Sequence, residues 1–109
     1  MAPAVKTLYF KGIPVRFVYV EGQWMMALAD IGKALRSSNI VQKSQQQITN
    51  RQRILVKVPV PGRGEQFITF VTPRGVYVMA RGTRSPRGGE FLRWAERAFA
   101  DVRREDEAR

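Results

Sequence analysis

The sequence contains no cysteine and no histidine among its 109 residues. Without cysteine there can be no disulfide and no thiolate ligand for zinc. Without histidine there is no imidazole ligand and no base for a Ser-His or Cys-His catalytic pair. We therefore expect no metal, no cofactor and no catalytic residue, and we interpret the protein as a non-enzyme.

Long apolar runs are also missing. Residues 1–6 lack the apolar stretch of a signal peptide, and no segment reaches the roughly 18 apolar residues of a membrane-spanning helix. Hydrophobic residues still make up 44% of the chain, enough for one modest core. We expect a single domain over residues 1–109, with a core at about 5–104 and a frayed charged tail at 105–109. We expect it in the cytoplasm, at the nucleoid, or inside the host cell if the protein is viral.

Acidic residues are nearly missing from the middle of the chain. Residues 31–89 contain eleven basic residues and one acid, Glu65, whereas the rest of the chain contains eight of each sign. The formal net charge of +10 therefore belongs to the middle. A block of one sign costs self-repulsion that a polyanion relieves, so this pattern favours a nucleic acid as partner. A basic surface that only serves solubility is the alternative.

Turn residues and alternating hydrophobic residues predict a small antiparallel sheet. Lys11–Pro14 and Glu21–Gln23 are turn sequences that separate three β-prone runs and so predict a β-meander. The three runs are residues 5–10, 15–20 and 24–26. Trp24 is expected in the core rather than stacked on a base. The strand 15–20 is an edge that could pair with a second copy of the chain.

A helix pair is predicted to follow the meander. Asp30–Arg36 forms the first short helix, and Ser37–Asn39 supplies N-cap candidates for a second helix that reaches Ile48. On this second helix, Val41, Ser44 and Ile48 share the inner face.

A basic hairpin comes next. The runs 53–58 and 66–71 are predicted strands, and the prolines and glycines of the segment 59–65 end the first of them. A hairpin after a helix pair is the layout of a winged helix-turn-helix, so we expect the hairpin to be wing-like. Arg63 at its tip would then contact DNA, and the alternative is that it lies in a solvated turn.

Two further helices complete the predicted fold. Thr72-Pro73, an N-cap residue followed by proline, begins a helix that ends at Gly82. Ser85-Pro86 is the same kind of helix start. From Phe91 to Val102 apolar residues recur at helical spacing, which predicts an amphipathic helix. The expected fold class is α+β: a small antiparallel sheet with a β-meander, a helix pair, a basic hairpin and a C-terminal amphipathic helix packed on the sheet.

The order of these elements, together with several short motifs, is similar to the BRO-N domain. This is the N-terminal domain of phage and prophage antirepressor proteins and of BRO proteins in insect DNA viruses. The resemblance covers about residues 8–104. Its motifs are Phe10–Arg16, Trp24 with Ala29–Leu35, Phe70–Tyr77, Ser85-Pro86, Phe91–Trp94 and Val102–Arg104.

The resemblance implies a compact α+β fold without enzymatic activity that binds DNA, commonly in proteins that relieve repression of phage genes. A variable C-terminal domain usually follows this domain in the family. After Leu35 the family often continues with glycine and an aromatic residue, where this chain has Arg36-Ser37-Ser38 and then a glutamine-rich segment. No preference for a DNA sequence can therefore be carried over.

We predict that the basic middle binds duplex DNA. Lysine and arginine would hold phosphates, whereas asparagine and glutamine suit the bidentate hydrogen-bonding pattern of adenine. The phosphate-binding candidates are Lys33, Arg36, Lys43, Arg51, Arg53, Lys57, Arg63, Arg74, Arg81 and Arg84. The base-reading candidates are Asn39, Gln42 and Gln46. The middle offers few obvious aromatic stacking platforms, but charge alone leaves RNA open as a partner.

The main alternative is a protein-interaction module that binds and inactivates a transcriptional repressor without needing DNA. A homodimer is compatible with both functions. Catalysis is disfavoured because Asp30 is the only acid between Glu21 and Glu65, and helix capping explains it. The segment Gly62–Gly64 lacks the Lys-Ser/Thr sequence of a nucleotide-binding loop.

Overall fold

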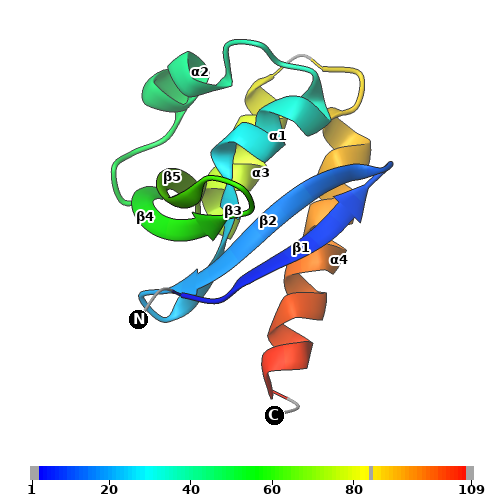
Figure 1. Ribbon diagram of the computed structural model, residues 1–109. Helices are drawn as coiled ribbons and strands as arrows, with labels where there is room; N and C mark the ends of the chain where they lie inside the picture. Colours follow the sequence, from blue (N-terminus) through cyan, green and yellow to red (C-terminus); the bar gives the residue numbers. More distant parts are fainter. Residues whose placement is uncertain (1–2, 84, 108–109) are drawn as a thin grey trace.

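The computed structural model describes residues 3–83 and 85–107, and in them three strands, two helices, two strands and two helices follow one another along the chain (Figure 1). They are β1 (Val5–Phe10), β2 (Ile13–Val20), β3 (Gln23–Ala27), α1 (Leu28–Leu35), α2 (Ile40–Gln47), β4 (Arg53–Val60), β5 (Gly64–Val71), α3 (Pro73–Gly82) and α4 (Gly88–Glu107). The strands form one antiparallel sheet in the order β1-β2-β3-β5-β4. The predicted α+β fold is confirmed, including the C-terminal helix that packs against the sheet.

The meander forms because its two turns have the sequence of tight hairpins. Lys11 and Gly12 have φ values of 49° and 81°, and Glu21 and Gly22 have φ values of 52° and 80°. Positive φ at both central residues gives a turn whose twist matches that of the strands it joins. Trp24 is buried in the core, as expected.

The edges of the sheet differ from the prediction. β2 pairs with β1 on one side and β3 on the other, so the expectation that the strand 15–20 is an exposed edge is wrong. β4 is an edge strand, and it runs to Val60 with Pro59 opposite Glu65. The expectation that Pro59 ends this strand is therefore also wrong, because an edge strand tolerates a residue without an N–H group.

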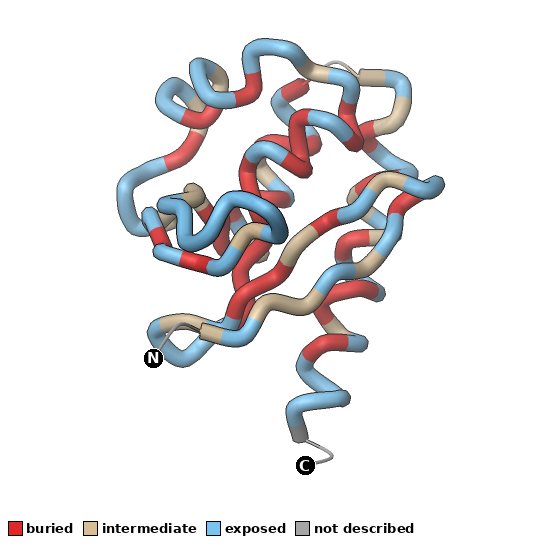
Figure 2. Tube along the Cα trace, in the orientation of Figure 1, coloured by how far each residue is buried: buried red, intermediate tan, exposed pale blue. Residues whose placement is uncertain are grey.

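The sheet has a core on each face. Along the chain, buried residues recur in the central strands and in α1, whereas the turns are mostly exposed (Figure 2). On one face, Phe17 and Met26 pack with α1, α3 and α4 in the larger cluster of buried residues. On the other face, Val18 and Met25 pack with Val56, Val58 and Phe70. Because β2 and β4 share this second core although two strands separate them, the sheet curls, and the β4–β5 hairpin is fixed by packing.

Asp30 does not cap a helix, contrary to the expectation. α1 begins two residues earlier, at Leu28, so Asp30 lies in its first turn. The buried Asp30 carboxylate accepts hydrogen bonds from the backbone N of Arg16 at 2.9 Å and from the guanidinium at 2.9 and 3.1 Å. These three bonds fasten α1 to β2. They satisfy a carboxylate that would be costly to bury alone, so the role of Asp30 is structural.

The buried side of α2 matches the predicted inner face at two of its three residues. Ser44 and Ile48 are buried as predicted, whereas Val41 is 59% exposed and its predicted place on that face is wrong. Ile40 is buried in its place. A Cβ atom on Gly32 would lie 2.7 Å from Cγ2 of Ile40, so the close contact of α1 with α2 depends on this glycine. Asn39 occupies the N-cap position, but its side chain makes no capping hydrogen bond.

The C-terminal helices begin and end close to the predicted residues. The Thr72 hydroxyl accepts a hydrogen bond from the backbone N of Gly75 at 3.1 Å, which caps α3 as predicted. α4 continues to Glu107, so the expectation of a frayed tail from residue 105 is wrong for 105–107, while 108 and 109 lie outside the described residues. None of the helices in the described ranges has the length and apolar content needed to cross a bilayer.

Candidate nucleic-acid interface

The ion pairs within the described residues all use basic residues from outside the basic middle, 31–89. They are Lys6–Glu105, Lys11–Glu90, Arg16–Asp30 and Arg104–Asp101. No lysine or arginine described within 31–89 lies within 4.0 Å of a described carboxylate oxygen. Ion pairs between described residues thus neutralise only cations outside the basic middle, and the described cations of the middle have no carboxylate partner among the described residues.

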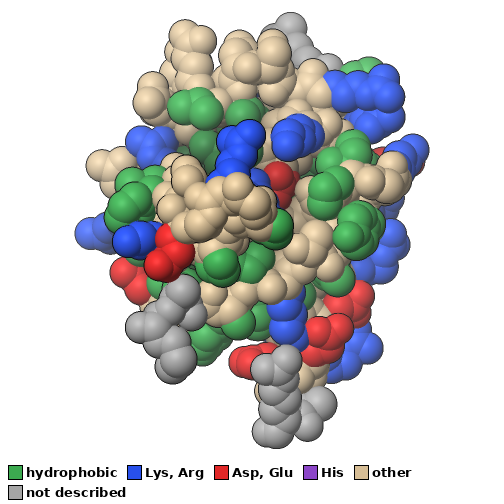
Figure 3. Space-filling view, in the orientation of Figure 1, with side chains coloured by type: hydrophobic (Ala, Val, Ile, Leu, Met, Phe, Trp, Pro, Cys, Tyr) green, Lys and Arg blue, Asp and Glu red, His purple; other side chains and the backbone are tan. Residues whose placement is uncertain are grey.

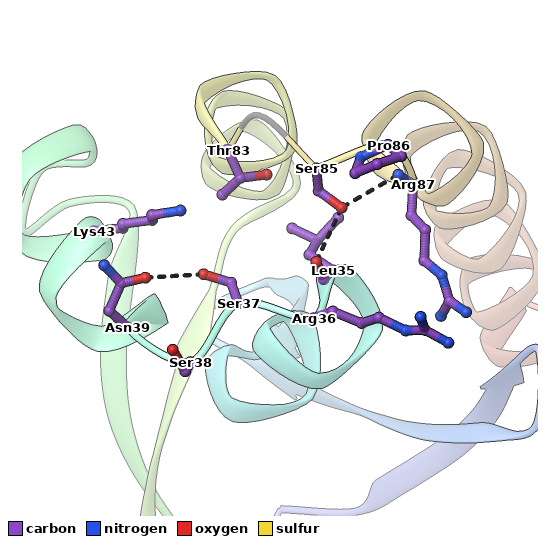
Figure 4. A pocket seen from close by; sticks show the side chains of 10 residues that line it. All are labelled: Leu35, Arg36, Ser37, Ser38, Asn39, Lys43, Thr83, Ser85, Pro86 and Arg87. Carbon is purple, nitrogen blue, oxygen red and sulfur yellow. Dashed lines mark hydrogen bonds between the residues drawn. The ribbon is translucent and has the colours of Figure 1, made fainter.

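Three of these cations surround a groove of about 500 Å³ between the end of α1, the start of α2 and the segment before α4 (Figure 4). Lys43 reaches into the groove from α2, and the Arg36 and Arg87 side chains extend toward its other end. The remaining lining consists of hydroxyl, amide and apolar groups from Leu35, Ser37, Ser38, Asn39, Thr83, Ser85 and Pro86. None of the described residues that line the groove is acidic.

A second groove of about 430 Å³ adjoins the first, because Arg36, Ser37 and Ser38 line both. It runs between α1 and α2 and adds Lys33 to the set of cations. We call these two hollows together the α1–α2 groove. Its four cations are Lys33, Arg36, Lys43 and Arg87. In the view of Figure 3, no acidic side chain covers the region of α2.

A single serine joins the two sides of this groove. The Ser85 hydroxyl donates a hydrogen bond to the carbonyl oxygen of Leu35 at 2.9 Å and accepts one from the backbone N of Arg87 at 3.2 Å. Leu35 is the last residue of α1, and 50 positions separate it from Ser85. The same side chain thus orders the backbone at Arg87 and fixes it beside the α1 terminus.

Arg36 adopts a backbone conformation that usually belongs to glycine. It follows α1 as the C-cap residue with φ 55° and ψ 42°, in the left-handed region. Glycine is the common residue where a helix ends in this way, since a side chain costs energy there. The arginine at this position extends from the helix terminus along the end of the groove where Arg87 lies (Figure 4). Backbone strain of this kind clusters at functional sites.

Glu90, the acid nearest to Arg87 in the sequence, is engaged elsewhere. A hydrogen bond from Lys11 lowers the pKa of Glu90, and the positive charges of Lys11, Arg87 and Arg93 act in the same direction. Glu90 therefore stays ionised and bound to Lys11. The guanidinium group of Arg87 makes no hydrogen bond or ion pair to the described residues.

The base-reading candidates lie on or beside α2. Gln42 and Gln46 are exposed and one helical turn apart, on a helix that carries no acid. Asn39 lines the groove, and its Oδ1 accepts a hydrogen bond from the Ser37 hydroxyl at 3.2 Å. The Gln47 amide donates to the carbonyl oxygen of Gly82 at 3.4 Å and so ties the far end of α2 to α3.

Two predicted phosphate-binding residues bond inside the protein. The Arg53 guanidinium donates to the Ser44 carbonyl oxygen at 2.8 Å and to Oδ1 of Asn50 at 3.0 Å. Arg81 donates to the Tyr77 hydroxyl at 2.8 Å, and its guanidinium lies 5.6 Å from the centre of that ring. Arg53 in particular joins β4 to α2, so its main role is structural.

The remaining phosphate-binding candidates lie away from the α1–α2 groove. Lys57 and Arg63 are exposed on the β4–β5 hairpin. Arg51 and Arg74 are both exposed near the start of α3. The two segments are joined there by a hydrogen bond of 2.9 Å from the backbone N of Thr72 to the carbonyl oxygen of Gln52. The groove is lined by Thr83, at the other end of α3. The ten residues of this helix span about 15 Å, and this length separates Arg51 and Arg74 from the groove. Arg84 lies outside the described residues.

The sequence prediction missed Arg87 as a site residue. Ser85-Pro86 indicated only the start of a helix, and nothing in the sequence shows that this start packs against the end of α1. The available signal was that Arg87, a member of the basic middle, directly follows a serine and a proline.

The fold and the site together define a small α+β protein with a basic surface free of carboxylate partners in its described part. Comparison with protein families, with curated proteins and with solved structures finds no match for this chain. The similarity to the BRO-N domain therefore rests on the quoted motifs alone and stays a prediction. Among the described residues, no group of three or more acids could hold a metal ion.

Proposed function

We propose that the protein binds duplex DNA through its basic middle, as the DNA-binding module of an antirepressor-type transcriptional regulator of a phage or prophage. The observation that supports this most is the α1–α2 groove, where four cations that have no carboxylate partner in the described part of the chain surround one loop. For this function we expect the protein in the cytoplasm, at the nucleoid or on viral DNA inside the host cell.

The chemistry of the groove suits a phosphate backbone. Arg36 and Arg87 each offer a planar fork of donors that can bind two phosphate oxygens, and Lys43 adds a point charge. α2 is eight residues long, or about 12 Å, and a helix of this kind fits the DNA major groove. With phosphates held at the groove, the amides of Gln42 and Gln46 would face the base edges, while Arg63 could contact a neighbouring phosphate.

Salt dependence tests this proposal. Each phosphate that a protein neutralises contributes about −0.9 to the slope of log affinity against log salt concentration for duplex DNA. Six such contacts would give a slope of about −5 in a fluorescence anisotropy titration of a labelled random duplex. A slope near zero would overturn the proposal.

A pair of double variants locates the contact. Lys43→Gln with Arg87→Gln removes two charges from the groove and should reduce the magnitude of the slope by about two. Arg93→Gln with Arg97→Gln removes two exposed charges from α4 and should leave the slope unchanged. Equal effects of the two double variants would mean that net charge alone, rather than the groove, binds the DNA.

The alternative function is binding to a transcriptional repressor without DNA, in which the same basic surface would contact acidic side chains. It predicts that the purified protein is retained by a candidate repressor but not by random duplex DNA at physiological salt. Retention by DNA alone favours the DNA-binding function.

A further inference from the structure

The β4–β5 hairpin extends beyond the part of the sheet that supports it. β4 and β5 pair along their whole length, from Arg53 opposite Val71 to Val60 opposite Gly64. β5 pairs with β3 only at Val71 and Phe70. Residues 64–69 are therefore joined to β4 alone and form a two-stranded ribbon.

The inner face of this ribbon is packed, but its outer face is open. Val56 and Val58 are buried against β2 and β3 in the second core. The alternate residues Leu55 and Lys57 point the other way, opposite Thr69 and Phe67 respectively. Leu55 is 59% exposed and Phe67 64% exposed, so the ribbon presents a large aromatic ring to solvent.

A cation accompanies this ring. The Lys57 ammonium lies 5.8 Å from the centre of the Phe67 ring, close enough for a cation–π interaction. Lys57 has no ion pair to a described carboxylate, although Glu65, the one acid of the basic middle, is exposed on the same face. Arg63 at the tip adds a second free cation, so the positive charges of the ribbon outnumber its single acid.

The outer face is also continuous with the side of the protein where α2 lies. Arg53 belongs to the same alternating set as Leu55 and Lys57, and its guanidinium is bonded to the Ser44 carbonyl oxygen of α2. A strand bound along the ribbon could therefore continue toward α2.

We infer that the outer face of the ribbon binds an unpaired nucleobase of DNA, which stacks on Phe67 while the adjacent phosphate pairs with Lys57. An exposed aromatic ring beside free cations on a β-ribbon is the combination that binds single-stranded nucleic acid. This inference rests on the proposed DNA-binding function and adds a second mode to it. The ribbon contacts DNA where the duplex is open, whereas the α1–α2 groove contacts duplex phosphates.

The test uses a short fluorescein-labelled oligothymidylate and the full chain. Base stacking on an aromatic side chain contributes enough that Phe67→Ala should weaken single-strand binding about tenfold. Phe67→Tyr, which keeps the ring, should bind like the wild type, whereas Phe67→Leu should be as weak as the alanine variant. Tyr9→Ala is the matched control, since Tyr9 is equally exposed, at 64%, on the opposite edge strand β1, and this variant should retain wild-type affinity.

Three outcomes would overturn the inference. In the first, Phe67→Ala binds the single strand as tightly as Tyr9→Ala. In the second, Phe67→Leu restores binding, because apolar bulk rather than stacking would then suffice. In the third, sedimentation equilibrium shows a wild-type dimer that Phe67→Ala converts to monomer, because Phe67 would then contact a second copy. The duplex salt slope, measured with the same variants, distinguishes these failures from failure of the proposed function, because Phe67→Ala should leave that slope unchanged.

Discussion

The Ser85 hydroxyl donates a hydrogen bond of 2.9 Å to the carbonyl oxygen of Leu35, and this contact holds the start of α4 against the end of α1. The bond also gives a partner to a carbonyl group at the end of α1, since the last carbonyl groups of an α-helix have no hydrogen-bond donor within the helix. Because Arg36 follows Leu35 directly and Arg87 lies two residues after Ser85, this hydrogen bond brings together two backbone segments that each carry an arginine lining the groove.

Ser85→Ala should therefore weaken both the fold and the interface. The variant loses two hydrogen bonds of the hydroxyl, to the Leu35 carbonyl oxygen and from the backbone N of Arg87, which should lower the free energy of unfolding by about 2 kcal/mol, measured by urea denaturation. With the segment around Arg87 released, we expect the duplex salt slope to fall in magnitude by about one. Ser38→Ala is the control, because Ser38 lines the same groove and is exposed. If the two variants behave alike, the Ser85 contact does not organise the site.

Arg36→Gly should separate stability from binding. Glycine adopts the left-handed conformation of residue 36 without the cost of a side chain, so the free energy of unfolding should stay equal or rise by up to about 1 kcal/mol. Duplex affinity should nevertheless fall, with a salt slope smaller by about one. Glu21→Gly makes the same backbone change at a turn outside the basic middle and should not reduce affinity. A loss of stability in Arg36→Gly would show that its side chain serves the fold.

Local signals predicted most of the secondary structure. Lys11-Gly12 and Glu21-Gly22 suit tight turns, and Thr72-Pro73 suits a helix start, because each depends only on the conformations of adjacent residues. Contacts between distant segments were not predictable in this way. The Asp30–Arg16 ion pair is an example, because Asp30 in a short helix equally suits capping until β2 is known to lie beside α1.

The candidate site was predictable as a charge block but not as a geometry. The count of basic residues identified the middle, yet it could not distinguish Arg53, which bonds to α2, from Lys43, which lines the groove. One residue of the inner face of α2 was misassigned for a related reason. Ile40 and Val41 lie four and three residues before Ser44, so both suit a helical face that contains Ser44, and spacing alone could not show that Ile40 is the buried one.

Arg53→Met and Arg51→Met form a matched pair that tests the structural role of Arg53. Each removes one positive charge. Arg53→Met also removes two hydrogen bonds from a charged group and should destabilise the protein by about 2 kcal/mol in urea denaturation. Arg51 is exposed, so Arg51→Met should change stability by less than about 0.5 kcal/mol.

For DNA binding we expect the larger effect from Arg51→Met, the variant with the smaller effect on stability. Arg51→Met should reduce the magnitude of the salt slope by about one, because its exposed guanidinium is available to a phosphate, whereas Arg53→Met should leave the slope of the folded protein unchanged. The opposite pattern would mean that the Arg53 guanidinium leaves Ser44 and Asn50 to bind DNA.

Gln42 and Gln46 allow base reading to be tested apart from phosphate binding. Both are uncharged and exposed on α2, so replacing them with alanine should leave the salt slope unchanged. A bidentate amide contact to adenine is worth about 1–3 kcal/mol of discrimination against another base. Selection from random duplexes should therefore enrich adenine at defined positions with the wild type and lose that preference with the double variant Gln42→Ala, Gln46→Ala.

Gln23→Ala is the control for this selection, because Gln23 is exposed at the start of β3, outside the basic middle. It should return the wild-type sequences. If the wild type enriches no sequence although its salt slope is steep, then α2 does not read bases, and the cations of the groove bind any duplex through its phosphates alone. Phosphate contacts carry no sequence information of their own, so any preference that remained would have to come from the shape or deformability of the DNA.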